Sequence, residues 1–219
     1  MSRRADNAAP ELLPTEPIEI IAPGAVWLRG FAEGAAEALL RAIECTAAAA
    51  PFRNMVTPGG FTMSVAMTNC GNAGWITDRR GYRYAARDPL TDKPWPAMPK
   101  LFAAIAARAA AAAGFADFVP DACLVNRYAP GAHMSLHQDK DERDFAQPIV
   151  SISLGLPATF LFGGLKRSDR PKRLRLESGD VVVWGGPTRR AFHGVDPLPA
   201  GIHPLTGACR YNLTLRKAL

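Results

Sequence analysis

PIVSISLGLPATFLFGG, residues 148–164, predicts two short strands with a turn near Gly155 and Pro157 between them. Apolar runs of this length, bounded by turn residues, are typical of buried strands. Similar segments occur on both sides of it, and they are CLVNRY (123–128), RLRLES (173–178), DVVVWGG (180–186), RRAFHGV (189–195) and CRYNLTLR (209–216). Short strands that follow one another with turns between them predict a β-sandwich or a jelly roll.

The chain upstream of these strands adds helices. IEIIAPGAVWLRG, residues 18–30, predicts one or two short strands broken at Pro23 and Gly24. Alanine, leucine and isoleucine then follow a helical period over residues 31–50, and again over residues 99–113. We therefore expect an α+β protein, in which two N-terminal helices pack on one sheet of a jelly-roll core, also called a double-stranded β-helix.

Two segments differ from this core. Residues 52–97 mix short β-like pieces with turns and aromatic residues of the kind often found exposed, which predicts a β-rich lid. Residues 1–17 are polar and contain several prolines, which predicts a flexible N-terminal arm. The remaining sequence shows no internal repeat and no clear linker, so residues 18–219 are predicted to form a single domain.

Composition narrows the class of protein. The 219 residues are 48% hydrophobic, which is enough for a real core, and the net charge of +6 mildly favours an anionic partner. The four cysteines form no C-x-x-C pair, as expected of reduced thiols. The sequence has neither a secretory signal nor an apolar run of membrane-spanning length. We expect a monomer in the cytoplasm with no membrane partner.

The segment SLHQDKDE, residues 135–142, points to a metal site. Residues spaced two apart on extended backbone point to the same side, so His137 and Asp139 can hold one ion together. His193, at the end of a predicted strand, is the candidate third ligand. Two imidazoles and one carboxylate form the facial triad of non-haem Fe(II) oxygenases, whereas zinc prefers four ligands with thiolate or a third imidazole.

The other two histidines are predicted to be structural or surface residues. His133 and His137 have the spacing of a helical zinc site, but the glutamate of H-E-x-x-H is missing and Met-Ser-Leu lies between them. Pro130 and Gly131 also argue against a helix there. His203 lies in no pattern that suggests a ligand.

Two strands carry groups that suit a dicarboxylate. In CRYNLTLR one face holds Arg210, Asn212, Thr214 and Arg216, and guanidinium groups turned inward would need anionic partners. Arginines that face solvent are the alternative. In CLVNRY one face presents an apolar wall, an amide and a phenol, which are Leu124, Asn126 and Tyr128. An ordinary half-buried core tyrosine is the alternative for Tyr128.

Taken together, these motifs resemble the AlkB family of Fe(II)- and 2-oxoglutarate-dependent dioxygenases. The likeness rests on LVNRYAPGAHMSLHQDKDE, PIVSISLGLPATFLFGG, GDVVVWGG, His193 and CRYNLTLR, and extends upstream to MVTPGGFTMSVAMTNCGNAGW and KPWPAMP. It implies that His137, Asp139 and His193 bind Fe(II). Arg210 would pair with the distal carboxylate of 2-oxoglutarate and Arg216 would lie nearer the metal. The other residues implied to contact the co-substrate are Leu124, Asn126, Tyr128 and Asn212.

The resemblance also implies a reaction. Fe(II), 2-oxoglutarate and O2 would oxidatively demethylate bases such as 1-methyladenine and 3-methylcytosine in alkylated DNA, with RNA as a further candidate, and would release succinate, CO2 and formaldehyde. DNA alkylation repair would be the role. The damaged base is cationic and suits an aromatic sandwich and a nearby anion, so Trp75, His193 and Asp141 are candidates for its pocket. The family pattern adds Met67 and Tyr82, and Glu142 is interpreted as a local charge only.

Basic residues near the lid and the FGGLKRSDRPKR segment are candidates for phosphate contacts, with Arg167 the foremost among Arg79, Arg80, Lys166, Arg167 and Arg170. Solvated surface charge is the alternative for each of them. Two other functions stay open at this point. One is a 2-oxoglutarate dioxygenase that acts on RNA, a protein or a small metabolite. The other is a non-catalytic jelly-roll module that binds an anion, which would explain the arginines but not the three candidate iron ligands.

Overall fold

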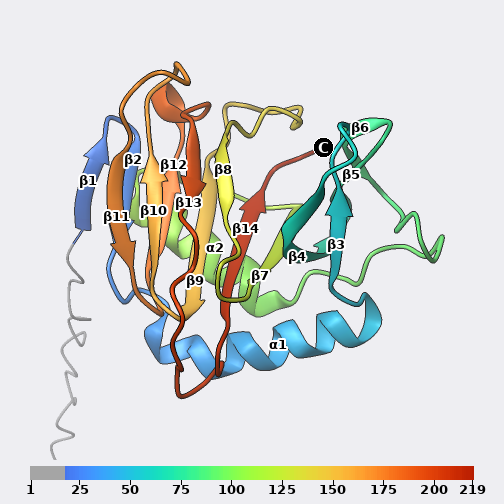
Figure 1. Cartoon of the computed structure of the whole chain (residues 1–219). Coiled ribbons are helices and arrows are strands. Elements are labelled where there is room, and N and C mark those ends of the chain that lie inside the picture. The colour runs from blue at the N-terminus through green and yellow to red at the C-terminus, as the bar shows by residue number, and fades with distance from the viewer. Residues whose placement is uncertain (1–17) are drawn as a thin grey trace, which may run out of the picture.

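The computed structural model describes residues 18–219, so the predicted N-terminal arm, residues 1–17, lies outside the described residues. Two sheets and two α-helices form the body of the protein (Figure 1). The larger sheet has eight strands in the order β1-β2-β12-β9-β14-β7-β4-β3. Its strands are β1 (Ile18–Ala22), β2 (Ala25–Leu28), β3 (Arg53–Val56), β4 (Thr62–Gly71), β7 (Ala122–Tyr128), β9 (Ile149–Gly155), β12 (Val181–Trp184) and β14 (Arg210–Arg216).

The smaller sheet has four strands in the order β11-β10-β13-β8. They are β8 (Met134–His137), β10 (Ala158–Phe162), β11 (Lys172–Leu176) and β13 (His193–Val195). Every pair in both sheets is antiparallel. Two facing antiparallel sheets confirm the predicted jelly-roll class of an α+β protein.

The two helices lie on the face of the larger sheet that is turned away from the smaller one (Figure 1). They are α1 (Ala36–Ala49), preceded by the 3₁₀ turn η1 (Glu33–Ala35), and α2 (Lys100–Ala112). The second helix starts and ends within one residue of its prediction, whereas the first begins later than expected because the 3₁₀ turn comes first. Neither α-helix in the described part of the chain has the length and hydropathy that a membrane crossing requires.

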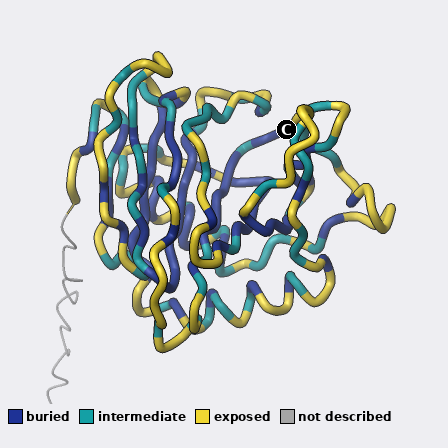
Figure 2. The backbone as a smooth tube through the Cα atoms, in the orientation of Figure 1, coloured by how far each residue is buried: buried dark blue, intermediate teal, exposed yellow. Residues whose placement is uncertain are grey.

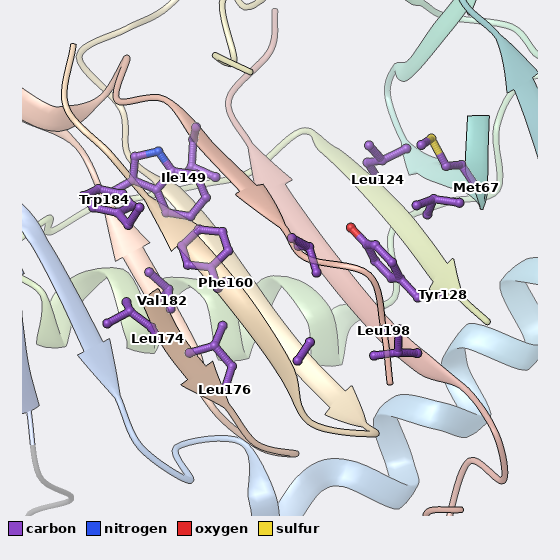
Figure 3. Packing of buried hydrophobic residues seen from close by; sticks show 14 of the residues in the cluster. Met67, Leu124, Tyr128, Ile149, Phe160, Leu174, Leu176, Val182, Trp184 and Leu198 are labelled. Atoms are coloured by element: carbon purple, nitrogen blue, oxygen red, sulfur yellow. The ribbon is translucent and has the colours of Figure 1, made fainter. Parts of the chain in front are cut away.

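Strand alternation divides the core into two clusters. Val181 and Val183 of β12 pack toward the helices with Leu213 and Leu215 of β14. Val182 and Trp184 point the other way, into the space between the sheets, where Trp184 meets Phe160 (Figure 3). Figure 2 shows the buried strands in the middle of the molecule and the exposed outer face of α1. A ligand-binding site inside the protein would therefore lie between the two sheets.

The segment predicted as a lid is divided between two sheets. β3 and β4 continue the larger sheet, because β3 pairs with β4 and β4 pairs with β7. Only β5 (Gly74–Asp78) and β6 (Gly81–Ala85) form a sheet of their own, a hairpin that lies beside the chain's C-terminal end (Figure 1).

Candidate metal and co-substrate site

The two candidate histidine ligands lie opposite each other on neighbouring strands of the smaller sheet. His137 ends β8 and His193 begins β13, and the two residues are direct register partners. Their ring centroids are 4.3 Å apart. Gly194 permits this close pairing, because a Cβ atom there would lie 2.6 Å from the Met134 carbonyl oxygen of β8. The sheet register therefore brings together two histidines that are far apart in sequence.

Asp139 completes the group two residues after β8 ends. One carboxylate oxygen, Oδ1, lies 3.8 Å from His137 Nε2, and the other, Oδ2, lies 3.9 Å from His193 Nε2. One potential ligand atom from each residue can be chosen so that all three lie within 4.8 Å of one another. These three groups face a common point, so they could hold one divalent cation.

Hydrogen bonds fix the tautomers of both imidazoles. His137 Nδ1 lies 2.9 Å from the Ser135 carbonyl oxygen, and His193 Nδ1 lies 3.0 Å from the Ala191 carbonyl oxygen. A carbonyl oxygen only accepts, so each Nδ1 carries the proton and each Nε2 keeps a free lone pair. Burial also lowers the pKa of His193 to about 4, so this ring is neutral at pH 7, as metal coordination requires.

Arg216 holds the carboxylate of Asp139 in its charged form. Its Nε donates to Asp139 Oδ2 at 2.8 Å, and its Nη2 lies 2.6 Å from the same oxygen. Burial alone would raise the pKa of Asp139, but the Arg216 guanidinium and the two imidazoles outweigh burial and hold this pKa below its usual range. Asp139 therefore presents a carboxylate to a cation, with Oδ1 free of the arginine.

A cavity beside the three groups extends between the two sheets. It has about 390 Å³ of space not filled by protein, part of it open to solvent. Its floor is a polar layer in which Asn212 Nδ2 donates to Ser151 Oγ at 2.7 Å and Thr214 Oγ1 donates to Asn212 Oδ1 at 2.9 Å. The predicted co-substrate residues that line it are Leu124, Asn126, Tyr128, Asn212 and Arg216.

Arg210 does not line this cavity but lies behind Tyr128, with its guanidinium carbon 5.2 Å from the phenol ring centroid. Only 1% of Arg210 is exposed, and its Nη2 donates to Ser153 Oγ at 3.0 Å. Its Nε and Nη1 are buried and have no hydrogen-bond partner among residues 18–219. A buried guanidinium with two free donors lowers the stability of the fold when it has no anionic partner. It fits a small carboxylate ligand, so the residues present suit 2-oxoglutarate.

The structure brings three of the predicted substrate residues together. Trp75 on β5 donates from Nε1 to Asp141 Oδ2 at 2.9 Å, and its ring stacks on Tyr82 of β6 with centroids 5.7 Å apart and planes 19° apart. Asp141 follows the proposed ligand Asp139 by two residues. An aromatic stack is therefore bonded to a carboxylate that lies two residues along the chain from the metal-binding residue Asp139.

The other two predicted substrate residues lie differently. Met67 on β4 is 1% exposed and packs in the core near Leu124, but does not itself line the cavity (Figure 3). Arg167 is exposed, and its guanidinium carbon lies 5.9 Å from the ring centroid of Phe192, the residue before His193. Arg167 thus lies on the side of the molecule where the metal-binding group is found.

Sequence reasoning missed the role of the charges behind Asp139. Glu142 is not the local surface charge that its acidic run suggested, since its side chain is 2% exposed. It accepts a hydrogen bond from Tyr84 of the hairpin at 2.8 Å and lies near two arginines, with Arg189 Nη2 3.3 Å from Oε2 and Arg216 Nε 3.4 Å from Oε1. No local pattern marks these partners, because they lie 47 to 74 residues from Glu142 in the sequence.

A jelly roll that presents two histidines and a carboxylate, and that also holds a buried arginine suited to a small carboxylate, defines a class: the non-haem Fe(II) oxygenases that use a 2-oxo acid. A family model described as the 2OG-Fe(II) oxygenase superfamily matches residues 24–216. The α-ketoglutarate-dependent dioxygenases AlkB of Salmonella typhimurium and of Escherichia coli are each 66% identical to this chain over 200 residues, which are 91% of this chain and 93% of the relative.

The solved structure of OsALKBH1 is also similar. It has 30% sequence identity and a TM-score of 0.79, and the match covers 92% of this chain and 100% of that one. The chain therefore belongs to the 2OG-Fe(II) oxygenase superfamily and, within it, to the AlkB family. It is an Fe(II)- and 2-oxoglutarate-dependent dioxygenase.

Proposed function

We propose that this enzyme oxidatively removes methyl groups from alkylated bases such as 1-methyladenine and 3-methylcytosine in DNA, and so repairs alkylation damage. The observation that carries the proposal is the Trp75, Tyr82 and Asp141 group, whose carboxylate follows the metal-binding residue Asp139 by two residues. Methylation at these ring nitrogens leaves a cationic base that pairs poorly, so it costs less to extrude from a duplex than a normal base. An aromatic ring and a carboxylate suit such a cation.

In this proposal His137, Asp139 and His193 bind Fe(II), while Arg210 binds the distal carboxylate of 2-oxoglutarate and Leu124, Asn126, Tyr128 and Asn212 shape its pocket. Arg216 keeps Asp139 ionised and oriented. When bound, Fe(II) and 2-oxoglutarate would supply the oxidising chemistry, with O2 as the oxidant. The products would be succinate, CO2 and a hydroxymethylated base that loses formaldehyde. Trp184 and Phe160 give the cavity apolar walls, which help to exclude water.

On the substrate side, we propose that the damaged base stacks between Trp75 and His193 and that Asp141 accepts a hydrogen bond from its exocyclic amine. Tyr82 extends the aromatic surface on which a neighbouring group can rest. Met67 belongs to the core cluster against which Trp75 packs, and it supports this aromatic surface from the core. The hairpin then serves as the nucleotide-recognition lid, a smaller element than residues 52–97 as a whole.

The proposed function is tested by aerobic incubation with Fe(II), 2-oxoglutarate and oligonucleotides that carry one defined lesion. We expect formaldehyde release and a mass loss of one methylene from 3-methylcytosine in DNA. The other target classes are tested with matched RNA oligonucleotides, a methylated peptide and free 1-methyladenosine. Turnover of one of these without turnover of DNA would show that the substrate is not DNA. Failure to bind Fe(II) under anaerobic conditions would favour the non-catalytic anion-binding module.

We further propose that residues 18–219 act as one domain, and that the chain works as a monomer in the cytoplasm with no membrane partner. The proposal of one domain is supported by the β4–β7 pairing, which joins the 52–97 segment to the jelly roll through a continuous sheet. Light scattering coupled to size exclusion tests the monomer, and subcellular fractionation tests the location.

Arg167 is predicted to contact a phosphate of the substrate strand. We expect Arg167→Gln to weaken the binding of methylated oligonucleotides of any sequence and to reduce the slope of log affinity against log salt by about one, because one ion pair is lost. Fluorescence anisotropy at several salt concentrations measures both effects. Arg41→Gln on the outer face of α1 is the matched control. Equal slopes for the two variants would remove Arg167 from the interface.

A further inference from the structure

The hairpin is attached to the loop after β8 by two side-chain hydrogen bonds. Trp75 and Tyr84 are direct register partners across the hairpin, so their side chains leave it on the same face. Trp75 Nε1 donates to Asp141 Oδ2 at 2.9 Å, and the Tyr84 hydroxyl donates to Glu142 Oε1 at 2.8 Å. One pair of opposite residues therefore binds two consecutive carboxylates, immediately after the metal-binding residue Asp139.

The two hydrogen bonds differ in their surroundings. Asp141 is only partly buried and lines a cleft together with Tyr82, Tyr84 and Arg143, with about 570 Å³ of space not filled by protein, part of it open to solvent. Glu142 is buried, does not line that cleft, and is flanked by the guanidinium groups of Arg189 and Arg216. The cleft is lined by Asp141, the acceptor of the first bond, and by Tyr84, the donor of the second. A ligand in the cleft can therefore reach the Asp141 carboxylate, whereas the Glu142 carboxylate lies behind the surface.

The second bond is also connected to the metal-binding group. Arg216 lies against both Glu142 Oε1 and Asp139 Oδ2, so Tyr84 and Asp139 are separated only by Glu142 and one guanidinium. Burial raises the pKa of Tyr84 well above that of an ordinary tyrosine, which keeps the hydroxyl as a donor. This chain of contacts gives the hairpin a fixed position relative to the metal-binding residues.

We propose that Tyr84 is a positioning residue that keeps the hairpin in place while the substrate base replaces Trp75 as the partner of Asp141. This inference rests on the proposed function, in which Asp141 accepts from the base. Once the base binds Asp141, Trp75 has lost its hydrogen bond to the loop. The Tyr84 to Glu142 bond then holds β6, and through the hairpin it holds the Trp75 ring beside the metal-binding group, where the base must stack.

The test is Tyr84→Phe, which removes one oxygen atom and keeps the ring. We expect KM for a 3-methylcytosine oligonucleotide to rise about tenfold, since a hydrogen bond to a charged group is lost. We expect kcat to change less than KM, and 2-oxoglutarate turnover without a nucleic acid to stay as in the wild type, because the three metal-binding residues are untouched. Tyr211→Phe, the same change on the helix-facing side of β14, is the control.

A second measurement needs no substrate. The indole N–H of Trp75, assigned by its absence in Trp75→Phe, should be protected from hydrogen exchange in the wild-type protein by its bond to Asp141. We expect this exchange to be about tenfold faster in Tyr84→Phe and unchanged in Tyr211→Phe. Circular dichroism and a thermal melt identify a variant that has not folded, and Tyr84→Leu, which also lacks the hydroxyl, then replaces it.

The outcomes separate the two proposals. A wild-type protein that does not demethylate any oligonucleotide would overturn the proposed function, while the indole exchange would still report whether Tyr84 anchors the hairpin. An active wild type together with a Tyr84→Phe variant of unchanged KM would overturn the positioning role only. So would a loss of kcat at unchanged KM, since that result would place Tyr84 in the chemical step instead of in substrate positioning.

Discussion

His137→Ala is expected to abolish formaldehyde release and to weaken Fe(II) binding by more than about a hundredfold, beyond the effect of losing a residue that only supports a ligand. His137 supplies one of the three groups that face a common point, and its Nε2 carries a free lone pair because Nδ1 donates to the Ser135 carbonyl. Alanine leaves two ligands, which are too few to hold the ion in competition with water.

His133→Ala is the matched control for this prediction. His133 lies four residues earlier in the same segment and is exposed, with its ring 3.5 Å from the Gly131 carbonyl oxygen and outside the metal-binding group. Equilibrium dialysis with Fe(II) or Mn(II) under anaerobic conditions measures binding without turnover. Equal metal affinity in the two variants would contradict the proposed centre, and an equal loss of activity without a loss of metal would place His137 in another role.

Local patterns in the sequence were enough to predict the strand faces that build the site. On β14 the period of two predicted that Asn212 and Arg216 share a face opposite Leu213 and Leu215, and this is confirmed, since the leucines pack toward the helices while the polar residues line the cavity. Both arginines of this strand are buried, so the solvent-exposed alternative is wrong. Alternation suffices here because β14 lies between two layers of the fold.

Partners across long stretches of chain could not be predicted in this way. The sequence predicted short β-like pieces within residues 52–97, but nothing local shows that β4 pairs with β7 and not with the hairpin. Glu142 likewise lies in an acidic run that would be solvated by default, and only its contacts with Arg189 and Arg216 explain its burial. Pairing and charge compensation depend on tertiary contacts, which a single sequence does not display.

Arg210→Met is expected to raise KM for 2-oxoglutarate at least about thirtyfold, because removal of one partner of a buried charge pair costs about 2 kcal/mol or more. The substitution should not lower the stability of the protein without 2-oxoglutarate. Arg210 is buried, its Nε and Nη1 have no partner in the described part of the chain, and burial lowers the pKa of its guanidinium. In the absence of a carboxylate this charge therefore destabilises the fold. Methionine fills similar space without that cost, so we expect the melting temperature of the apo variant to be equal or higher.

A higher KM for 2-oxoglutarate together with an equal or higher melting temperature distinguishes a binding role of Arg210 from a structural one. Arg175→Met on the exposed strand β11, which removes a pair with Glu177 at the surface, is the control and should leave both quantities unchanged. Thermal melts with and without 2-oxoglutarate measure the effect directly, since a ligand that binds only the folded state raises the melting temperature. The wild-type protein should gain stability from 2-oxoglutarate and Arg210→Met should gain little. A variant that melts lower without ligand, yet is stabilised by 2-oxoglutarate as strongly as the wild type, would show that Arg210 supports the sheet and that the carboxylate is bound elsewhere.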